Sequence, residues 1–179
     1  IFGANIGTTT GAWLIAGLGL KVDIATYAMP MLVFGTILMF KRDKKTKGIG
    51  YILAGLGFLF LGIAYMKEGF EAFKATLDLT QFAIGGFKGL LIFTFIGILA
   101  TVIMQSSHAT LVLIITALGS GQITYENALA LAIGSNIGTT ITAVIGSLTS
   151  GLEGKKLAGA HVIFNVFTGL IAIILINPF

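Results

Sequence analysis

The sequence predicts an all-α polytopic membrane protein built from inverted-topology repeats, with a re-entrant hairpin and discontinuous helices. Three observations support this fold class. Only 10% of the 179 residues are charged and 56% are hydrophobic, the charges are separated by long uncharged runs, and one heptapeptide occurs twice. A soluble domain carries about 25% charged residues, so the composition excludes a soluble enzyme, a disordered segment and a nucleic-acid binder. The absence of cysteine excludes disulfides and cysteine-ligated metals.

The uncharged runs match the length of membrane spans, because a spanning helix needs about 20 mostly apolar residues. These runs cover 1–20, 24–40, 48–66, 89–125, 127–152 and 157–179. Most of them predict one span each, whereas 89–125 is too long for one helix and awkward for two. The chain opens inside an apolar segment without a Met and stops directly after a span, so we expect a piece of a longer protein.

The charged loops predict how the chain is oriented in the cell membrane. Loop 41–47 holds five Lys or Arg residues and one Asp, so the positive-inside rule places it in the cytoplasm. A second basic loop at 155–156 is also expected inside, and the balanced stretch 67–78 outside. Segment 67–87 interleaves aromatic and charged residues, which is typical of an amphipathic helix on the outer surface that connects the repeats.

This orientation requires 89–125 to begin and end on the same side of the membrane. The run therefore predicts a re-entrant hairpin or two short crossings. Its most polar part is Met104–Thr110. Lipid cannot satisfy the backbone groups of a re-entrant tip, so such a tip must be polar and buried in protein. We expect the tip at this polar stretch.

A duplicated heptapeptide indicates an internal repeat. Gly3–Thr9 and Gly134–Thr140 share six of seven residues at an offset of 131. The loops that follow the two copies are expected on opposite sides of the membrane, which is the arrangement of inverted repeats in secondary transporters. Two glycines around an Asn, followed by two Thr, suit an unwound turn at a binding site. Helix packing is the alternative for such small residues, and we prefer it for Gly55, Gly57 and Gly62.

The repeats divide the chain into three parts. Residues 1–40 form a partial first repeat, whose N-terminal portion would precede Ile1. Residues 41–87 hold the cytoplasmic loop, a connecting span and the outer linker. Residues 88–179 form the second, inverted repeat.

The paired heptapeptides, with Gln105-Ser106-Ser107 lying 29 residues before Gly134, resemble the type II sodium–phosphate cotransporters and their bacterial relatives. The resemblance implies sodium-coupled symport of inorganic phosphate by alternating access, and a transporter rather than an enzyme. It departs from the family motif at the third Ser, where this chain has His108.

The resemblance also implies a set of binding residues. The substrate and ion candidates are Gln105, Ser106, Ser107, His108, Thr110, Asn5, Thr8, Thr9, Ser135, Asn136, Thr139 and Thr140. Sodium ligands are expected among Asn5, Thr8, Ser106, Asn136 and Thr139. The expected partners are inorganic phosphate, Na+ and the lipid bilayer, with no cofactor other than the coupling ion and no nucleic acid. The sequence does not determine whether the protein forms an oligomer.

The charge distribution supports sodium as the coupling ion. Burying phosphate without compensation is very costly, and the candidate core holds no Lys or Arg. Compensation must therefore come from a co-bound cation, from helix N-termini or from protonated His108. The apolar runs hold no Asp or Glu for a proton relay.

Two other functions stay open at this point. The first is a carrier or channel for another anion or small solute, with His108 altering its selectivity. The second is an intramembrane hydrolase that uses Ser107 and a His, which is disfavoured because no acidic residue is available to orient the His. For His161 we expect an interfacial or interhelical hydrogen-bonding role.

Overall fold

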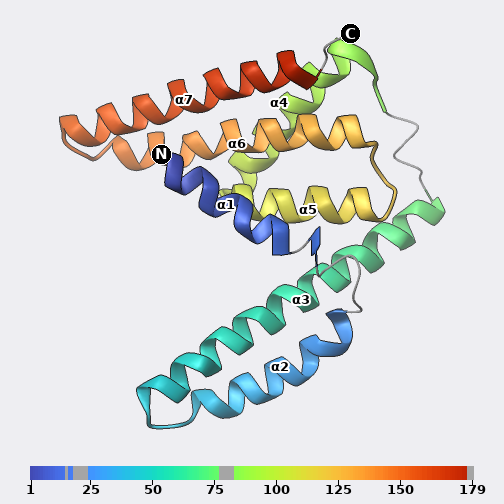
Figure 1. Ribbon diagram of the computed structural model, residues 1–179, viewed down its shortest axis with the longest axis vertical. Coiled ribbons are helices and arrows are strands. Elements are labelled where there is room, and N and C mark those ends of the chain that lie inside the picture. The colour runs from blue at the N-terminus through green and yellow to red at the C-terminus, as the bar shows by residue number, and fades with distance from the viewer. Residues whose placement is uncertain (15, 18–23, 77–82, 177–179) are drawn as a thin grey trace. The chain divides into compact units, whose positions relative to one another are not determined.

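The structure is a computed structural model that describes residues 1–14, 16–17, 24–76 and 83–176. These residues form seven α-helices and no strand (Figure 1). The helices are α1 (Phe2–Leu14), α2 (Ile24–Met39), α3 (Lys44–Thr76), α4 (Gly86–Met104), α5 (Ser107–Gly119), α6 (Tyr125–Ser147) and α7 (Leu152–Ile176). They divide into two units, one of residues 13–77 and one of residues 1–12 with 78–179.

Within the described residues, four helices are long and apolar enough to cross a membrane. They cover Lys44–Gly69, Gly86–Met104, Tyr125–Ser147 and Leu152–Ile176, and α2 and α5 are shorter apolar helices. The prediction of a polytopic all-helical membrane protein is therefore confirmed. The expected separate helix over 67–87 is wrong, because α3 continues through Thr76 and residues 83–85 are not helical. Residues 77–82 of that expected helix lie outside the described part of the chain.

The unit of α2 and α3 is a helical hairpin whose helices approach closely through glycines. A Cβ added to Gly35 would lie 2.6 Å from the backbone nitrogen of Ala54, and one added to Gly57 would lie 2.8 Å from the Leu32 side chain. The packing role expected for Gly57 is confirmed, whereas nothing lies within 4 Å of a Cβ at Gly55 or Gly62.

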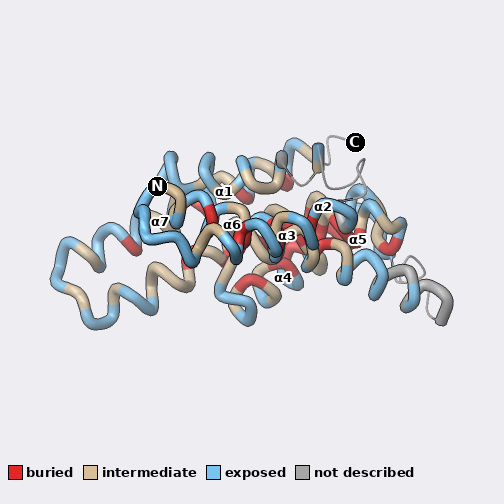
Figure 2. The backbone as a smooth tube through the Cα atoms, turned by 90° about the horizontal axis from the view of Figure 1, so that it is seen from below, coloured by how far each residue is buried: buried red, intermediate tan, exposed pale blue. Residues whose placement is uncertain are grey.

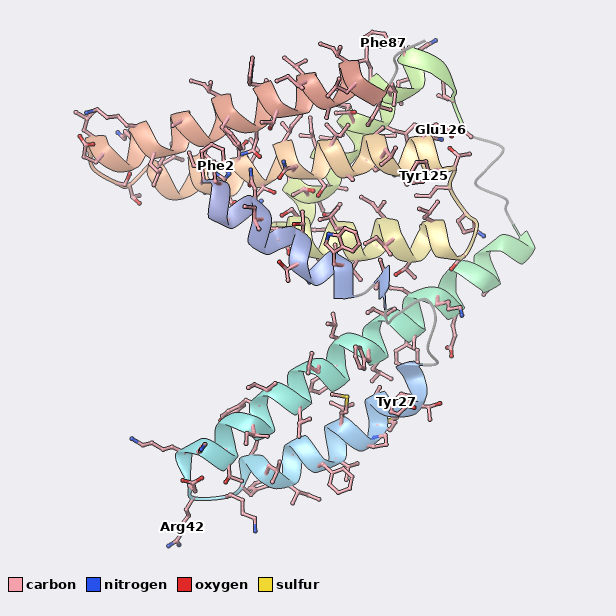
Figure 3. All side chains as sticks on the ribbon, in the orientation of Figure 1. Phe2, Tyr27, Arg42, Phe87, Tyr125 and Glu126 are labelled. Atoms are coloured by element: carbon pink, nitrogen blue, oxygen red, sulfur yellow. The ribbon has the colours of Figure 1, made fainter. Side chains whose placement is uncertain are left out.

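The basic loop 41–47 closes this hairpin, and Figure 3 shows Arg42 pointing away from it. Asp43 caps α3, since its carboxylate accepts hydrogen bonds of 2.8 Å from both the backbone nitrogen and the hydroxyl of Thr46. These bonds stabilise the ionised form and hold the pKa of Asp43 below its ordinary value. The cap therefore fixes where α3 begins, directly beside the basic residues.

In the other unit, α4 and α6 pack through glycines of the second heptapeptide. A Cβ at Gly134 would overlap the carbonyl oxygen of Thr94, and one at Gly138 would lie 2.8 Å from the Thr101 Cβ. The unwound turn expected over Gly134–Thr140 is wrong, because α6 is a continuous helix through these residues. The first heptapeptide is likewise helical, in α1. In the second copy, the glycines that suggested unwinding instead allow two backbones to approach, as small residues do between membrane helices. In the first copy, nothing lies within 4 Å of a Cβ at Gly3 or Gly7.

The chain breaks between α4 and α5 at the polar stretch where a tip was expected. Gln105 has a φ of 52°, in the left-handed region that ends many helices, and its Nε2 donates to the carbonyl of Val102 at 2.6 Å. Ser106 then caps α5 by accepting from the backbone nitrogen of Ala109 at 3.2 Å. The two helices have 19 and 13 residues, or about 28 Å and 20 Å at 1.5 Å per residue.

Helix α1 packs on this unit through contacts of Phe2, Asn5 and Gly11, which are spaced by multiples of three residues along the helix. Phe2, which is labelled in Figure 3, meets Phe164 edge-on with ring centroids 4.7 Å apart, and Asn5 donates to Asn165 at 3.0 Å. One turn beyond Thr8, Gly11 lies directly against the imidazole of His108. Helices α1 and α6, which carry the two heptapeptides, run in opposite directions (Figure 1).

The interior of the described chain is unusually polar, and Figure 2 shows where its buried positions lie. The largest fully buried side chains all carry polar groups, and they are Gln122, Asn165, Thr101, Thr110, Thr116 and Ser135. Large apolar side chains such as Phe95, Ile163 and Ile174 are exposed instead. This inversion suits a protein whose surroundings are lipid and whose inside meets polar groups.

Candidate functional site

A pocket of about 240 Å³ lies at the break between α4 and α5. It is lined by one or more residues from each of four helices and the break, namely Thr8, Thr101, Gln105, Ser106, Ser107, His108, Thr139 and Thr142. This volume lies below the range of about 300–1,000 Å³ typical of drug-sized ligands. The lining contains hydroxyls, one carboxamide and one imidazole, and no Lys, Arg, Asp or Glu. The pocket therefore suits small ions that are held by neutral polar groups.

The two copies of the heptapeptide contribute equivalent residues to this pocket. Thr8 and Thr139 are both the sixth residue of their copy, and both line it. The same offset of 131 relates Gly11 to Thr142. The imidazole of His108 lies against Gly11, and Thr142 lines the pocket. Both copies of the heptapeptide therefore contribute to the lining of the pocket.

One group of lining side chains has already donated its hydrogens elsewhere. The hydroxyls of Thr8, Thr139 and Thr142 donate to carbonyls of their own helices at 3.0, 3.0 and 2.7 Å. Thr101 donates to Thr110 at 3.1 Å, and the carboxamide nitrogen of Gln105 is bonded to Val102. A hydroxyl has one hydrogen and two lone pairs, so the remaining capacity of the four Thr hydroxyls is to accept. The Gln105 carboxamide keeps one N–H hydrogen besides its acceptor oxygen. We call these five lining residues the acceptor wall.

The start of α5 supplies groups of the opposite kind. The oxygen of Ser106 accepts from Ala109 and leaves its hydroxyl hydrogen to donate, and Ser107 and His108 line the pocket in the first turn. The first amides of a helix have no acceptor within the helix, and they carry the positive end of its dipole. We call Ser106, Ser107 and His108 the donor wall, and its arrangement favours an anion.

Six of the candidate residues line the pocket and six do not. The lining ones are Thr8, Gln105, Ser106, Ser107, His108 and Thr139. Thr110 and Ser135 support the wall from behind, since Thr110 accepts from Thr101 and the Ser135 hydroxyl donates to the Ser107 carbonyl at 3.4 Å. The others lie outside the lining, with Asn5 bonded to Asn165, Asn136 half-buried, and Thr9 and Thr140 bonded within their own helices.

Comparison with known proteins identifies the family. The model of the Na+/Pi-cotransporter family matches residues 1–68 and 78–177. The chain belongs to the Na+/Pi-cotransporter family. No solved structure matches it.

Curated relatives of this cotransporter-family chain are longer than the chain itself. It is 31% identical to "Uncharacterized protein YqeW" of Bacillus subtilis over its whole length, which covers 55% of that protein. It is 22% identical to "Putative inorganic phosphate export protein YjbB" of Salmonella typhimurium and 23% identical to the Escherichia coli protein of the same name. These matches cover 99% and 96% of the chain and 32% and 31% of those relatives. The chain thus spans about half of the first relative and a third of the others.

Two lining residues of the pocket, and Asn165 on α7, were not predicted from the sequence. Thr142 follows Thr139 by three residues and Thr101 precedes Gln105 by four, so both lie one helical turn from a predicted position. Extending each motif by one turn would have found them. Asn165 carries no such signal, because its partner Asn5 is 160 residues away.

His161 lies one turn before Asn165 on α7. Its backbone carbonyl accepts from the Asn165 carboxamide at 2.9 Å, and its Nε2 is buried without a hydrogen-bond partner among the described residues. An interfacial or interhelical hydrogen-bonding role was expected for His161; the hydrogen bond that joins α7 to α1 is made by Asn165. No group of three or more His, Cys, Asp or Glu in the described chain is placed to hold a metal.

Proposed function

We propose that the protein is a sodium-coupled symporter of inorganic phosphate that works by alternating access. The observation that carries this proposal is a single pocket whose lining contains both the acceptor wall and the donor wall of α5. Neutral oxygens with free lone pairs suit a hard cation such as Na+, and hydroxyl, imidazole and amide donors suit phosphate. Membership of the cotransporter family supports the same pair of ligands.

Charge balance explains why the two ions would bind together. The lining holds no fixed cation, and an anion taken into such a pocket without compensation would lose several kcal/mol of solvation free energy. A sodium ion at the acceptor wall compensates the charge of phosphate at the donor wall. Each ion therefore raises the affinity for the other, which is the thermodynamic basis of coupling.

The experiment that tests the proposal is uptake of radiolabelled phosphate into proteoliposomes of the protein that contains this chain. Phosphate should accumulate when an inward sodium gradient is applied and should not when potassium replaces sodium. Phosphate uptake at the same rate with and without sodium would contradict the coupling of phosphate to sodium transport. Transport of sulfate or another anion in place of phosphate would favour the alternative carrier. Because two relatives are named for phosphate export, reversing the gradient tests whether the same cycle runs outward.

The two walls predict different kinetic defects. Thr142→Val removes an acceptor oxygen with little change in volume, and we expect about a tenfold higher sodium concentration for half-maximal uptake, or 1.4 kcal/mol. Ser107→Ala removes a donor, and we expect a similar rise in the phosphate KM at saturating sodium. Both constants are measured for both variants in proteoliposomes. Equal shifts of both constants in both variants would contradict the division into two walls.

A further inference from the structure

Asn165 is fully buried on α7, at 0% exposure. Its carboxamide makes two hydrogen bonds, because Nδ2 donates to the His161 carbonyl at 2.9 Å and Oδ1 accepts from Nδ2 of Asn5 at 3.0 Å. Asn5 belongs to the first heptapeptide and lies one turn before Thr8, which is part of the acceptor wall. Asn165 thus connects α7 to Asn5, which precedes the lining residue Thr8 by one turn, and neither Asn lines the pocket.

This pair of bonds fixes which atom each carboxamide presents. A backbone carbonyl can only accept a hydrogen bond, so the end of Asn165 that faces His161 must be its nitrogen. The other end of Asn165 is then an oxygen, and Asn5 must offer its own nitrogen to it. No described residue donates to Oδ1 of Asn5. The contact therefore leaves an oxygen, and not a nitrogen, as the available atom of Asn5.

We propose that Asn165 is a positioning residue that orients the carboxamide oxygen of Asn5 as a ligand for the coupling sodium ion. The inference rests on the proposed sodium coupling and assigns a partner to one ligand of that ion. Groups that hold a metal ligand in place affect the affinity of the site for the metal, because their loss lowers that affinity by about 10- to 100-fold. Asn165 would act on sodium through Asn5 and would not touch phosphate.

The alternative is that Asn165 only attaches α1 to α7. The edge-on contact of Phe2 with Phe164 already joins the same two helices one turn earlier. A role in attachment predicts lower thermal stability and no change in the sodium concentration that the protein needs. A role in positioning predicts that the sodium requirement changes while the phosphate KM at saturating sodium stays constant.

The experiment compares Asn165→Leu and Asn165→Ser with the unmodified protein. The Ser hydroxyl can donate to the His161 carbonyl four residues back, as Thr168 donates to the Phe164 carbonyl, but it is too short to reach Asn5. This second variant keeps the test valid if the Leu variant does not fold. Thr168→Val is the matched control, because its hydroxyl bonds only within α7. Stabilisation against heat is titrated with NaCl in the absence of phosphate, with total ionic strength held by choline chloride.

For both Asn165 variants we expect the sodium concentration at half-maximal stabilisation to rise at least about tenfold, with the Thr168→Val control unchanged. In proteoliposomes, the phosphate KM at saturating sodium should stay within about twofold of that of the unmodified protein. If both Asn165 variants need the same sodium concentration for half-maximal stabilisation as the unmodified protein, the positioning role is overturned and the proposed symport stays intact. An unmodified protein that sodium does not stabilise, and that transports phosphate without sodium, would overturn the symport and this inference together.

Discussion

Gly134→Ala is expected to destabilise the protein strongly, because its new methyl group would overlap the backbone carbonyl of Thr94 on α4. A backbone atom inside a helix cannot rotate away as a side chain can, so α4 and α6 must separate. Overpacking of this kind costs about 1–3 kcal/mol, and each kcal/mol lowers Tm by roughly 2–4 °C in a chain of this size. Thermal unfolding of the purified protein in detergent, followed by circular dichroism, measures the effect.

Gly146→Ala is the matched control on the same helix. Nothing lies within 4 Å of a Cβ at Gly146, and alanine is a better helix former than glycine by about 1 kcal/mol. The control variant should therefore keep or slightly raise Tm. If both variants unfold at the same temperature, the close approach of α4 and α6 at Gly134 is not a determinant of stability.

Gly11→Ala is expected to impair transport and leave the fold intact. The added Cβ would meet the imidazole of His108, with Nδ1 and Nε2 each 2.9 Å away. These atoms are the far end of a movable side chain, so the ring can rotate while both helices stay in place. His108 belongs to the donor wall, however, so the displaced ring changes the pocket. We expect about a tenfold loss of kcat/KM for phosphate, or 1.4 kcal/mol, with Tm close to that of the unmodified protein.

A second substitution tests the cause of this loss. In the double variant Gly11→Ala/His108→Ser, the smaller side chain leaves room for the new methyl group, so uptake should recover relative to Gly11→Ala alone. Gly7→Ala, on the same helix with nothing within 4 Å of its Cβ, should keep the Tm of the unmodified protein. A double variant as poor as Gly11→Ala would mean that the contact between Gly11 and His108 is not responsible.

The helices and the position of the break between α4 and α5 could be predicted because both follow from the solvent. The uncharged runs 48–66, 127–152 and 157–179 appear as spans in α3, α6 and α7, and the polar residues at Gln105–Ser106 mark the break between α4 and α5. Lipid gives unpaired backbone groups no partner, so a break has to be accompanied by polar side chains. Local composition is enough to locate such features.

The structure of the heptapeptides could not be predicted in the same way. Glycine serves both for unusual backbone angles and for close approach of two chains, and only the partner decides between them. At Gly134 that partner is the Thr94 carbonyl, 40 residues earlier. The bond between Asn5 and Asn165 is a similar case. Which side chains reach the pocket also depends on the packing of four helices, and this explains why Asn136 lies outside its lining although Thr139 is in it.

The neutral lining of the pocket has a consequence for the membrane potential. An elementary charge that crosses 100 mV gains or loses about 2.3 kcal/mol. The lining holds no Lys, Arg, Asp or Glu, so in the proposed cycle none of these fixed charges crosses that field when the empty pocket returns. In the symport proposed above, the charge that moves in the loaded state is the sum of the charges of the bound phosphate and of the sodium ions. Under that proposal, the voltage dependence of transport gives the number of sodium ions per phosphate for a given protonation state of the phosphate.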